Sequence, residues 1–196
     1  MEKNKGYTLV EMVIVIAIMA ILASLSMFSV GIIRDAKRSA AINTFDNQIS
    51  SCLVKTKAVS DATNGLNKEV CMFIYRRTIG TKTNYCIKIG YSKGDGVQDF
   101  IKKDESGNGI ILDSSHADNL NDDTNWDAVL PKDVTDIIDE DGNSITSKKI
   151  IFNKSNGSVK SGYGNYYFFK NATRDDAGVE FANIYLDKST GNHYIK

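Results

Sequence analysis

The chain has 196 residues, enough for one domain together with a leader or an anchor. Its 24 basic residues balance its 24 acidic residues, so the overall charge predicts no nucleic-acid partner. Three cysteines cannot all be paired, which excludes a complete disulfide framework. No phosphate-binding loop, G-x-S-x-G or H-E-x-x-H sequence is present, and both histidines, His116 and His193, are isolated, so the sequence does not indicate an enzyme.

An uncharged, strongly apolar segment extends from Met12 to Gly31. As a helix it would span roughly 30 Å, the thickness of the hydrocarbon core of a bilayer. Because Lys3 and Lys5 precede it, we expect the N-terminus to begin on the cytoplasmic side. An ordinary cleaved signal peptide has a shorter apolar region and a clearer cleavage site than this sequence offers. A plain anchor fits the length but leaves Glu11 unexplained, because a charged side chain in hydrocarbon costs roughly 2.5–3.5 kcal/mol.

The sequence KGYTLVE, from Lys5 to Glu11, resembles the class III leader of type IV pilins and type II secretion pseudopilins. That leader has basic residues, a glycine, a hydrophobic residue that is usually Phe, T-L-[VI]-E and an apolar stretch; here Tyr7 stands in place of Phe. The resemblance implies that a membrane-embedded prepilin peptidase cuts after Gly6 and that Tyr7 becomes the N-methylated first residue. It also implies that Glu11 pairs with the N-terminal amine of a neighbouring subunit during filament assembly, which lowers the cost of burying both charges.

The helix is expected to continue beyond the apolar segment, because the following sequence has good helix formers and no proline. Gly31 is the one candidate break, and Asn64-Gly65 offers a stop. We therefore predict a single helix over about residues 7–62 whose second half is amphipathic and packs on a globular head. The residues expected to face the head recur at helical spacing: Ile32, Ile33, Ala36, Ala40, Ala41, Phe45, Ile49, Cys52, Leu53 and Thr56. The predicted organisation is a cleaved leader (1–6), a transmembrane or filament-core half-helix (7–31), an amphipathic half-helix (32–64) and a β-rich head (65–196).

From about Val70 the chain changes to short segments rich in β-branched and aromatic residues, separated by turn sequences. The segments expected to form strands are EVCMFIYRR, NYCIKIGY, GIIL, KKIIF, NYYFF, VEFANIYLD and HYIK. Because one face of VEFANIYLD is not cleanly apolar, we expect that strand to be covered on both sides. The predicted fold class is α+β, and the resemblance implies the type IV pilin fold with a mostly antiparallel sheet.

The C-terminal sequence is also similar to minor pilins and pseudopilins of the GspH/FimT type. In that group a strand ending in F-x-x-x-G precedes a hairpin and a last strand with S-x-G. Phe152, Gly157, Ser189 and Gly191 hold the comparable places. This similarity favours a minor subunit over a major one.

Residues 113–141 are strongly acidic, and Lys132 is their one basic residue. A calcium loop is the functional interpretation, since Ca²⁺ prefers several carboxylate and carbonyl ligands. The segment does not match the spacing of a known calcium loop, and we favour a solvated loop with hairpin turns. We expect Trp126 to be a buried anchor for this loop.

The three cysteines show no metal-ligand spacing, and we expect them to act as small buried apolar residues. If a disulfide forms, the first candidate joins Cys52 to Cys71 or Cys86. The last two are expected on neighbouring strands without necessarily facing each other.

Together these features predict a structural subunit without enzymatic activity, most simply a minor pilin of a type IV pilus or related filament. The resemblance implies roles in adhesion, motility or filament initiation, with other pilin subunits, the prepilin peptidase, the pilus assembly platform and the membrane as partners. The precursor would cross the cytoplasmic membrane once with its head outside and then enter a cell-surface filament. Two alternatives remain open: a pseudopilin of a type II secretion or competence DNA-uptake system, and a membrane-anchored binding domain that does not polymerise.

Overall fold

The computed structural model describes residues 8–58, 69–80, 82–92, 100–103, 109–112, 117–171 and 178–196. These residues divide into two compact units, of which the first ends at Lys37 and the second begins at Arg38. The helix α1 (Leu9–Ala58) begins in the first unit and continues as an α-helix into the second. Gly31 lies within α1 and does not break it. The predicted long helix is therefore confirmed for 9–58, whereas Tyr7, 59–62 and Asn64-Gly65 lie outside the described residues.

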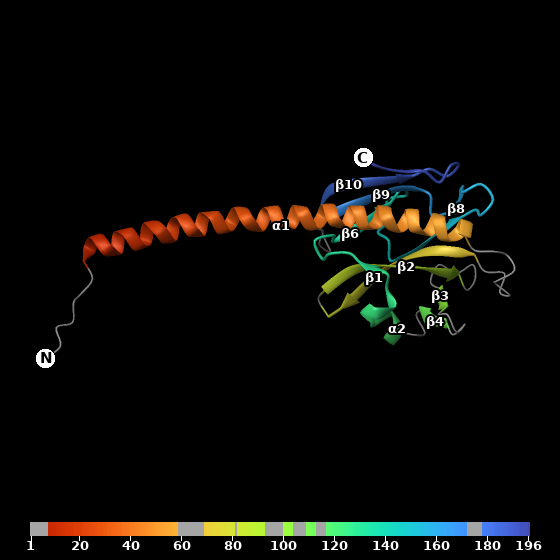
Figure 1. The fold of residues 1–196 in the computed structure, drawn as a ribbon, viewed down its shortest axis with the longest axis horizontal. Coiled ribbons are helices and arrows are strands. Elements are labelled where there is room, and N and C mark those ends of the chain that lie inside the picture. The colour runs from red at the N-terminus through yellow and green to blue at the C-terminus, as the bar shows by residue number, and fades with distance from the viewer. Residues whose placement is uncertain are drawn as a thin grey trace. The chain divides into compact units, whose positions relative to one another are not determined.

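The described part of the head contains two antiparallel sheets. The seven-stranded sheet has the order β4-β3-β2-β1-β7-β8, with β5 paired to β2, and the four-stranded sheet has the order β11-β10-β9-β6. The larger sheet contains β1 (Val70–Ile79), β2 (Lys82–Ser92), β3 (Phe100–Lys103), β4 (Gly109–Leu112), β5 (Ala128–Val129), β7 (Ser147–Phe152) and β8 (Val159–Ser161). The smaller sheet contains β6 (Asp136–Asp139), β9 (Gly164–Lys170), β10 (Val179–Leu186) and β11 (His193–Ile195). The α+β prediction is confirmed, and the architecture is consistent with the type IV pilin fold (Figure 1).

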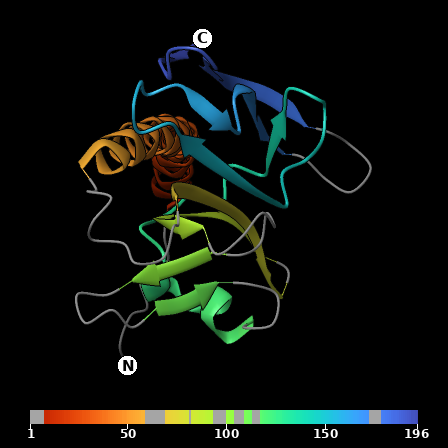
Figure 2. The ribbon, with the colours of Figure 1, turned by 90° about the vertical axis from the view of Figure 1, so that its right-hand side faces the viewer.

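The inner core of the head lies between the C-terminal part of α1 and both sheets. Within the head, β9 and β10 lie on one side of this helical segment and β1 and β2 on the other (Figures 1 and 2). Phe45 of α1 is fully buried, and its ring centroid lies 5.4 Å from that of Tyr166 and 5.1 Å from that of Phe168. These β9 rings join the helix directly to the smaller sheet, while Met72 and Ile74 of β1 complete the core from the larger one.

The helix face that packs on the head is shorter than predicted. Burial begins at Ala41, and the expected core positions Phe45, Ile49, Cys52 and Thr56 are all buried, with Leu53 partly buried. By contrast, four predicted contact residues are exposed: Ile32, Ile33, Ala36 and Ala40. The prediction is wrong there because helical spacing shows which side chains share a face but not where the covering layer begins.

The seven predicted strand segments all form strands, but β3, β5, β6 and β8 were not predicted. They contain only two to four residues, too short for an alternating pattern to stand out.

The prediction that β10 is covered on both faces is also wrong. A β-bulge shifts the register between Glu180 and Ala182, which lets both Phe181 and Ala182 pack on the inner core. Beyond the bulge, Ile184 and Leu186 are buried and alternate with half-buried residues.

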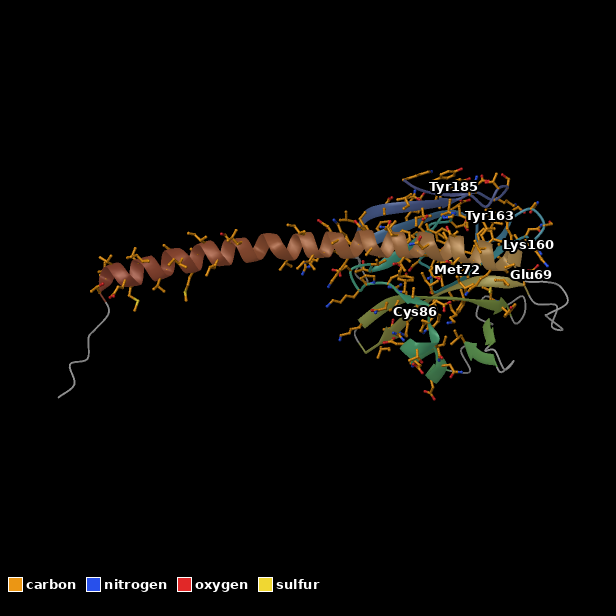
Figure 3. All side chains as sticks on the ribbon, in the orientation of Figure 1. Glu69, Met72, Cys86, Lys160, Tyr163 and Tyr185 are labelled. Carbon is orange, nitrogen blue, oxygen red and sulfur yellow. The ribbon has the colours of Figure 1, made fainter. Side chains whose placement is uncertain are left out.

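The acidic segment is folded over residues 117–139 rather than being a loop. It forms α2 (Ala117–Asn121), the 3₁₀ helix η2 (Asp123–Asn125), β5 and β6. Leu120 and Trp126 from this segment cover Cys71, Phe73 and Cys86 in a second core on the face of the larger sheet opposite α1. Figure 3 labels Met72 and Cys86, which belong to the inner and second cores respectively. The loop prediction failed because several carboxylates of the segment, among them Asp123, Asp127 and Asp139, pair with cations of the head.

The residues that carry the GspH/FimT similarity come together in two packed turns. Gly191 has a φ of +72°, and a Cβ on it would lie 2.1 Å from the carbonyl oxygen of Gly157 and 3.3 Å from the Phe152 ring. The Ser189 hydroxyl donates to Asp187 in the same turn, at 2.7 Å. A side chain at position 191 is therefore excluded both by backbone conformation and by the adjoining turn.

Candidate processing and assembly site

The first turn of α1 is closed by a capping box between Thr8 and Glu11. The Thr8 amide and hydroxyl both donate to Glu11 Oε2, at 2.8 and 2.9 Å, and the Glu11 amide donates to the Thr8 hydroxyl at 3.2 Å. Threonine at the N-cap and glutamate three residues later form this reciprocal arrangement because the first amides of a helix have no partner within it. The T-x-x-E spacing from Thr8 to Glu11 is a local sequence signal for this cap, which was not among the predictions.

The capping box gives Glu11 a role within its own chain. Glu11 Oε2 accepts both hydrogen bonds from Thr8, and no hydrogen bond to Glu11 Oε1 occurs within the described residues. An ionised carboxylate has about four acceptor positions, so a cation can bind Glu11 without displacing the cap. Gly6 and Tyr7, the predicted cleavage and methylation positions, lie outside the described residues, and their roles stay predictions.

The helix beyond this cap exposes an apolar surface on all sides. α1 is the one helix among the described residues that is long and apolar enough to cross a membrane, and its most apolar stretch of 18 residues is not buried. Leu9 is 81% exposed, and the large apolar side chains from Val10 to Leu25 are all about half exposed or more. Apolar surface of this extent marks contact with lipid or protein.

The exposed surface also continues past the uncharged segment. Ile32 is 71% exposed and Ile33 54%, although Arg34, Asp35 and Lys37 follow at once. Such a mixed apolar and charged surface is unsuited to the bilayer centre but suits a contact with another protein.

The cysteines form no disulfide and no cluster of three. All three are free and buried. Cys52 lies in the inner core on α1, whereas Cys71 and Cys86 lie in the second core on β1 and β2. These strands are neighbours, but Cys71 lies opposite Gly90 and Cys86 opposite Tyr75. Burial raises the pKa of Cys52 and Cys71 to about 12 and that of Cys86 to about 11, so the thiols stay protonated.

Carboxylates of the acidic segment bind cations of the larger sheet. Asp127 accepts from Lys88 at 2.5 Å and from the Ile89 amide at 2.8 Å. Asp123 pairs with Arg77, whose side chain is only 6% exposed. These pairs hold the segment against β1 and β2.

Further contacts complete the attachment of the segment. Asp139 binds Lys148 of β7 at 2.9 Å. The Trp126 indole donates to the Leu120 carbonyl at 3.2 Å and stacks on Tyr75 with the ring centroids 5.9 Å apart, which confirms Trp126 as an anchor. Within the described ranges, no three His, Cys, Asp or Glu side chains are grouped to hold a metal ion. Calcium binding by residues 113–141 stays a prediction, because 113–116, including His116, lie outside the described residues.

His193 is less isolated than its sequence position indicates. Its Nε2 lies 3.1 Å from the Ser50 hydroxyl and 3.2 Å from Asp46 Oδ1, so it links β11 to α1. A Ser-His-Asp triad needs the serine and the aspartate on opposite nitrogens of the imidazole ring. Here both partners share Nε2, and this geometry indicates a structural contact.

Comparison with known protein families supports the prediction of a prepilin leader at the N-terminus. The family profile described as "Prokaryotic N-terminal methylation motif" matches residues 1–27. This is the class III prepilin leader of type IV pilins and pseudopilins. A search of curated proteins and a search of solved structures gave no significant match.

Proposed function

We propose that this chain, whose leader and apolar helix make it a membrane-anchored, type IV pilin-like or pseudopilin-like subunit, is a minor pilin of an extracytoplasmic filament. The prepilin peptidase would cut after Gly6, and Tyr7 would be methylated. The subunit would then remain in the membrane with its head outside until the assembly platform extracts it. The observation that carries the proposal is the exposed apolar surface of α1, which covers the large apolar side chains from Leu9 to Leu25 and those of Val30, Ile32 and Ile33.

Two environments can cover this surface, and the filament proposal uses both. Before assembly, lipid covers the uncharged segment from Met12 to Gly31. In the filament, neighbouring helices replace the lipid and can also cover Ile32 and Ile33, which adjoin charged residues. In a subunit that stays in the membrane as a bare anchor, these two isoleucines would lie beyond the hydrocarbon core, without an apolar partner.

The role of Glu11 follows from its two kinds of contact. Within the chain it completes the capping box, and during assembly its charge would attract the methylated amine of a neighbour. Glutamine also serves as the third residue of a capping box. Glu11→Gln therefore removes the charge and keeps the cap, whereas Thr8→Ala removes the capping hydroxyl and keeps the charge.

Assembly of these two variants tests the proposal. We expect Glu11→Gln to be processed and retained in the membrane at parental levels but to enter sheared filaments at least about tenfold less, as measured by immunoblotting. Thr8→Ala should assemble far better than Glu11→Gln. Normal incorporation of Glu11→Gln, or equal loss in both variants, would refute charge pairing as the basis of assembly.

Deleting the prepilin peptidase separates a filament subunit from an anchored binding domain, because only the former depends on processing. Antibody labelling of intact cells then distinguishes long surface pili from a short secretion or competence filament. Long labelled filaments support the pilus proposal, and labelling confined to the envelope supports a pseudopilin.

A further inference from the structure

The outer face of the four-stranded sheet carries aromatic rings and amides. In β9 the buried residues Tyr166 and Phe168 point to the inner core, and in β10 Ile184 and Leu186 do the same. Because successive side chains of a strand alternate between faces, the residues between them point outward. We call this surface the aromatic–amide face: Asn165, Tyr167, Phe169, Asn183, Tyr185 and Tyr194.

Strand register places rings and amides next to one another on this face. Tyr185 lies opposite Asn165 of β9 and Tyr194 of β11, while Asn183 lies opposite Tyr167. Directly opposed residues have Cβ atoms about 4.5–5.5 Å apart, and diagonal neighbours about 7–8 Å. Each amide therefore lies opposite one tyrosine and two residues along its own strand from another, Tyr167 for Asn165 and Tyr185 for Asn183.

Both amides have an unused acceptor. Asn165 Oδ1 and Asn183 Oδ1 are enclosed by their surroundings, and neither has a hydrogen-bond donor among the described residues. Buried amide oxygens usually have a partner, since an unpaired one costs about 1–3 kcal/mol. Because both oxygens are covered in this arrangement, a ligand could supply the missing donors only after neighbouring side chains move.

Some of the side chains around these amides are exposed to solvent and can therefore move. Tyr194 is 53% exposed, and the Lys196 ammonium lies 4.8 Å from the centre of the Tyr185 ring. The Lys196 amide donates to the Asn183 carbonyl at 2.8 Å, which places this exposed lysine beside Asn183. Displacement of such an exposed side chain would open the face without a change in the sheet.

The charges at the margin do not favour an ionic ligand. Lys196 borders Asn183, while Glu180 and Asp136 lie opposite Phe169. Binding of single-stranded nucleic acid combines aromatic stacking with a positively charged groove. The mixed charges here do not provide such a groove.

We propose that the aromatic–amide face binds a neutral carbohydrate. The C–H face of a sugar ring would pack on Tyr185 and Tyr167, and its hydroxyls would donate to the oxygens of Asn183 and Asn165. A neutral sugar supplies both an apolar face and several O–H donors and needs no opposing charge. Because the face lies within one head, binding does not depend on filament assembly and can be tested separately from it.

The test uses the full-length chain in detergent and an array of immobilised neutral oligosaccharides, namely glucans, galactans, mannans and N-acetylglucosamine oligomers. Tyr185→Ala should weaken binding about tenfold or more, and Asn183→Leu should do the same. Tyr163→Ala is the matched control. Tyr163 is 40% exposed and has the Lys188 ammonium 4.4 Å from its ring centre, yet it lies outside the aromatic–amide face (Figure 3).

Retained binding in Tyr163→Ala, together with its loss in both face variants, supports the proposal. Unchanged fluorescence of Trp126 would show that each variant is folded, and Asn183→Leu keeps the test decisive if Tyr185→Ala does not fold. The proposal is overturned if the parent binds none of these glycans, or if the face variants bind like the parent. Stronger binding to single-stranded DNA than to glycans, or self-association lost in Tyr185→Ala without glycan binding, also overturns it.

Discussion

Replacement of Phe45 by alanine tests the division of α1 into a part that stabilises the head and a part that does not. Phe45 is fully buried against Tyr166 and Phe168. Truncation of a buried Phe to Ala typically costs about 3–5 kcal/mol, through lost apolar burial and the cavity that remains. We expect about 4 kcal/mol here, a large fraction of the roughly 5–15 kcal/mol that stabilises most domains.

The assay is urea unfolding of the full-length chain in detergent, followed by fluorescence. Trp126 is the single tryptophan and lies in the second core, so its emission reports on the head. With a urea dependence of about 2 kcal/mol per molar, the loss corresponds to a midpoint lower by about 2 M.

Two controls lie on the same helix. Val54 is 66% exposed and Ile33 is 54% exposed, so Val54→Ala and Ile33→Ala should each change the stability by less than about 0.5 kcal/mol. If Phe45→Ala unfolds at the same urea concentration as these controls, the described packing of α1 on the head is wrong.

Two further predictions concern the turns and the thiols. Gly191→Ala should destabilise the head by clearly more than Gly80→Ala in the same assay. Both glycines have a positive φ, in which a side chain costs about 1–2 kcal/mol. Of the two, however, only Gly191 would bring its new Cβ against a backbone atom, the carbonyl oxygen of Gly157. Equal losses would refute the packed-turn account. Burial raises the pKa of Cys52 from 9.0 to about 12. This thiol should therefore react with iodoacetamide at pH 8 about a thousandfold more slowly in the folded chain than in urea. Labelling of the native chain at the unfolded rate would contradict its burial. Because the folded-state pKa is the higher one, this thiol's contribution to stability is complete below pH 9 and is lost as the pH rises toward 12.

Local patterns were sufficient to predict the main elements of the fold. The change from helical spacing to short segments rich in β-branched residues near Val70 predicted the β-rich head, and the helix formers after Gly31 predicted the continuous helix. In both cases neighbouring residues determine the structure, so a single sequence contains the information.

Features that depend on distant residues could not be predicted. The acidic segment seemed solvated because its partners, Arg77 and Lys88, precede it by dozens of residues and give no local signal. The bulge that turns Phe181 inward likewise depends on pairing with β9. For the same reason spacing placed Ile32 on the packed face, although the covering layer begins only at Ala41.

Only part of the candidate site could be predicted from the sequence. The leader motif predicted the processing positions because a peptidase reads local sequence, and the family profile covers that stretch. The cap formed by Thr8 has an equally local signal, the T-x-x-E spacing, although it was not predicted. The aromatic–amide face required the strand register, which brings Tyr185 next to Asn165 from another strand.

Mass spectrometry of the N-terminal peptide from the membrane-extracted protein tests the central claim most directly. The account predicts a peptide that begins at Tyr7 and carries one added methyl group on its α-amine, with residues 1–6 absent. An intact Met1, or a first residue near Ser26 as left by an ordinary signal peptidase, would contradict the assignment of this chain as a processed pilin-like subunit.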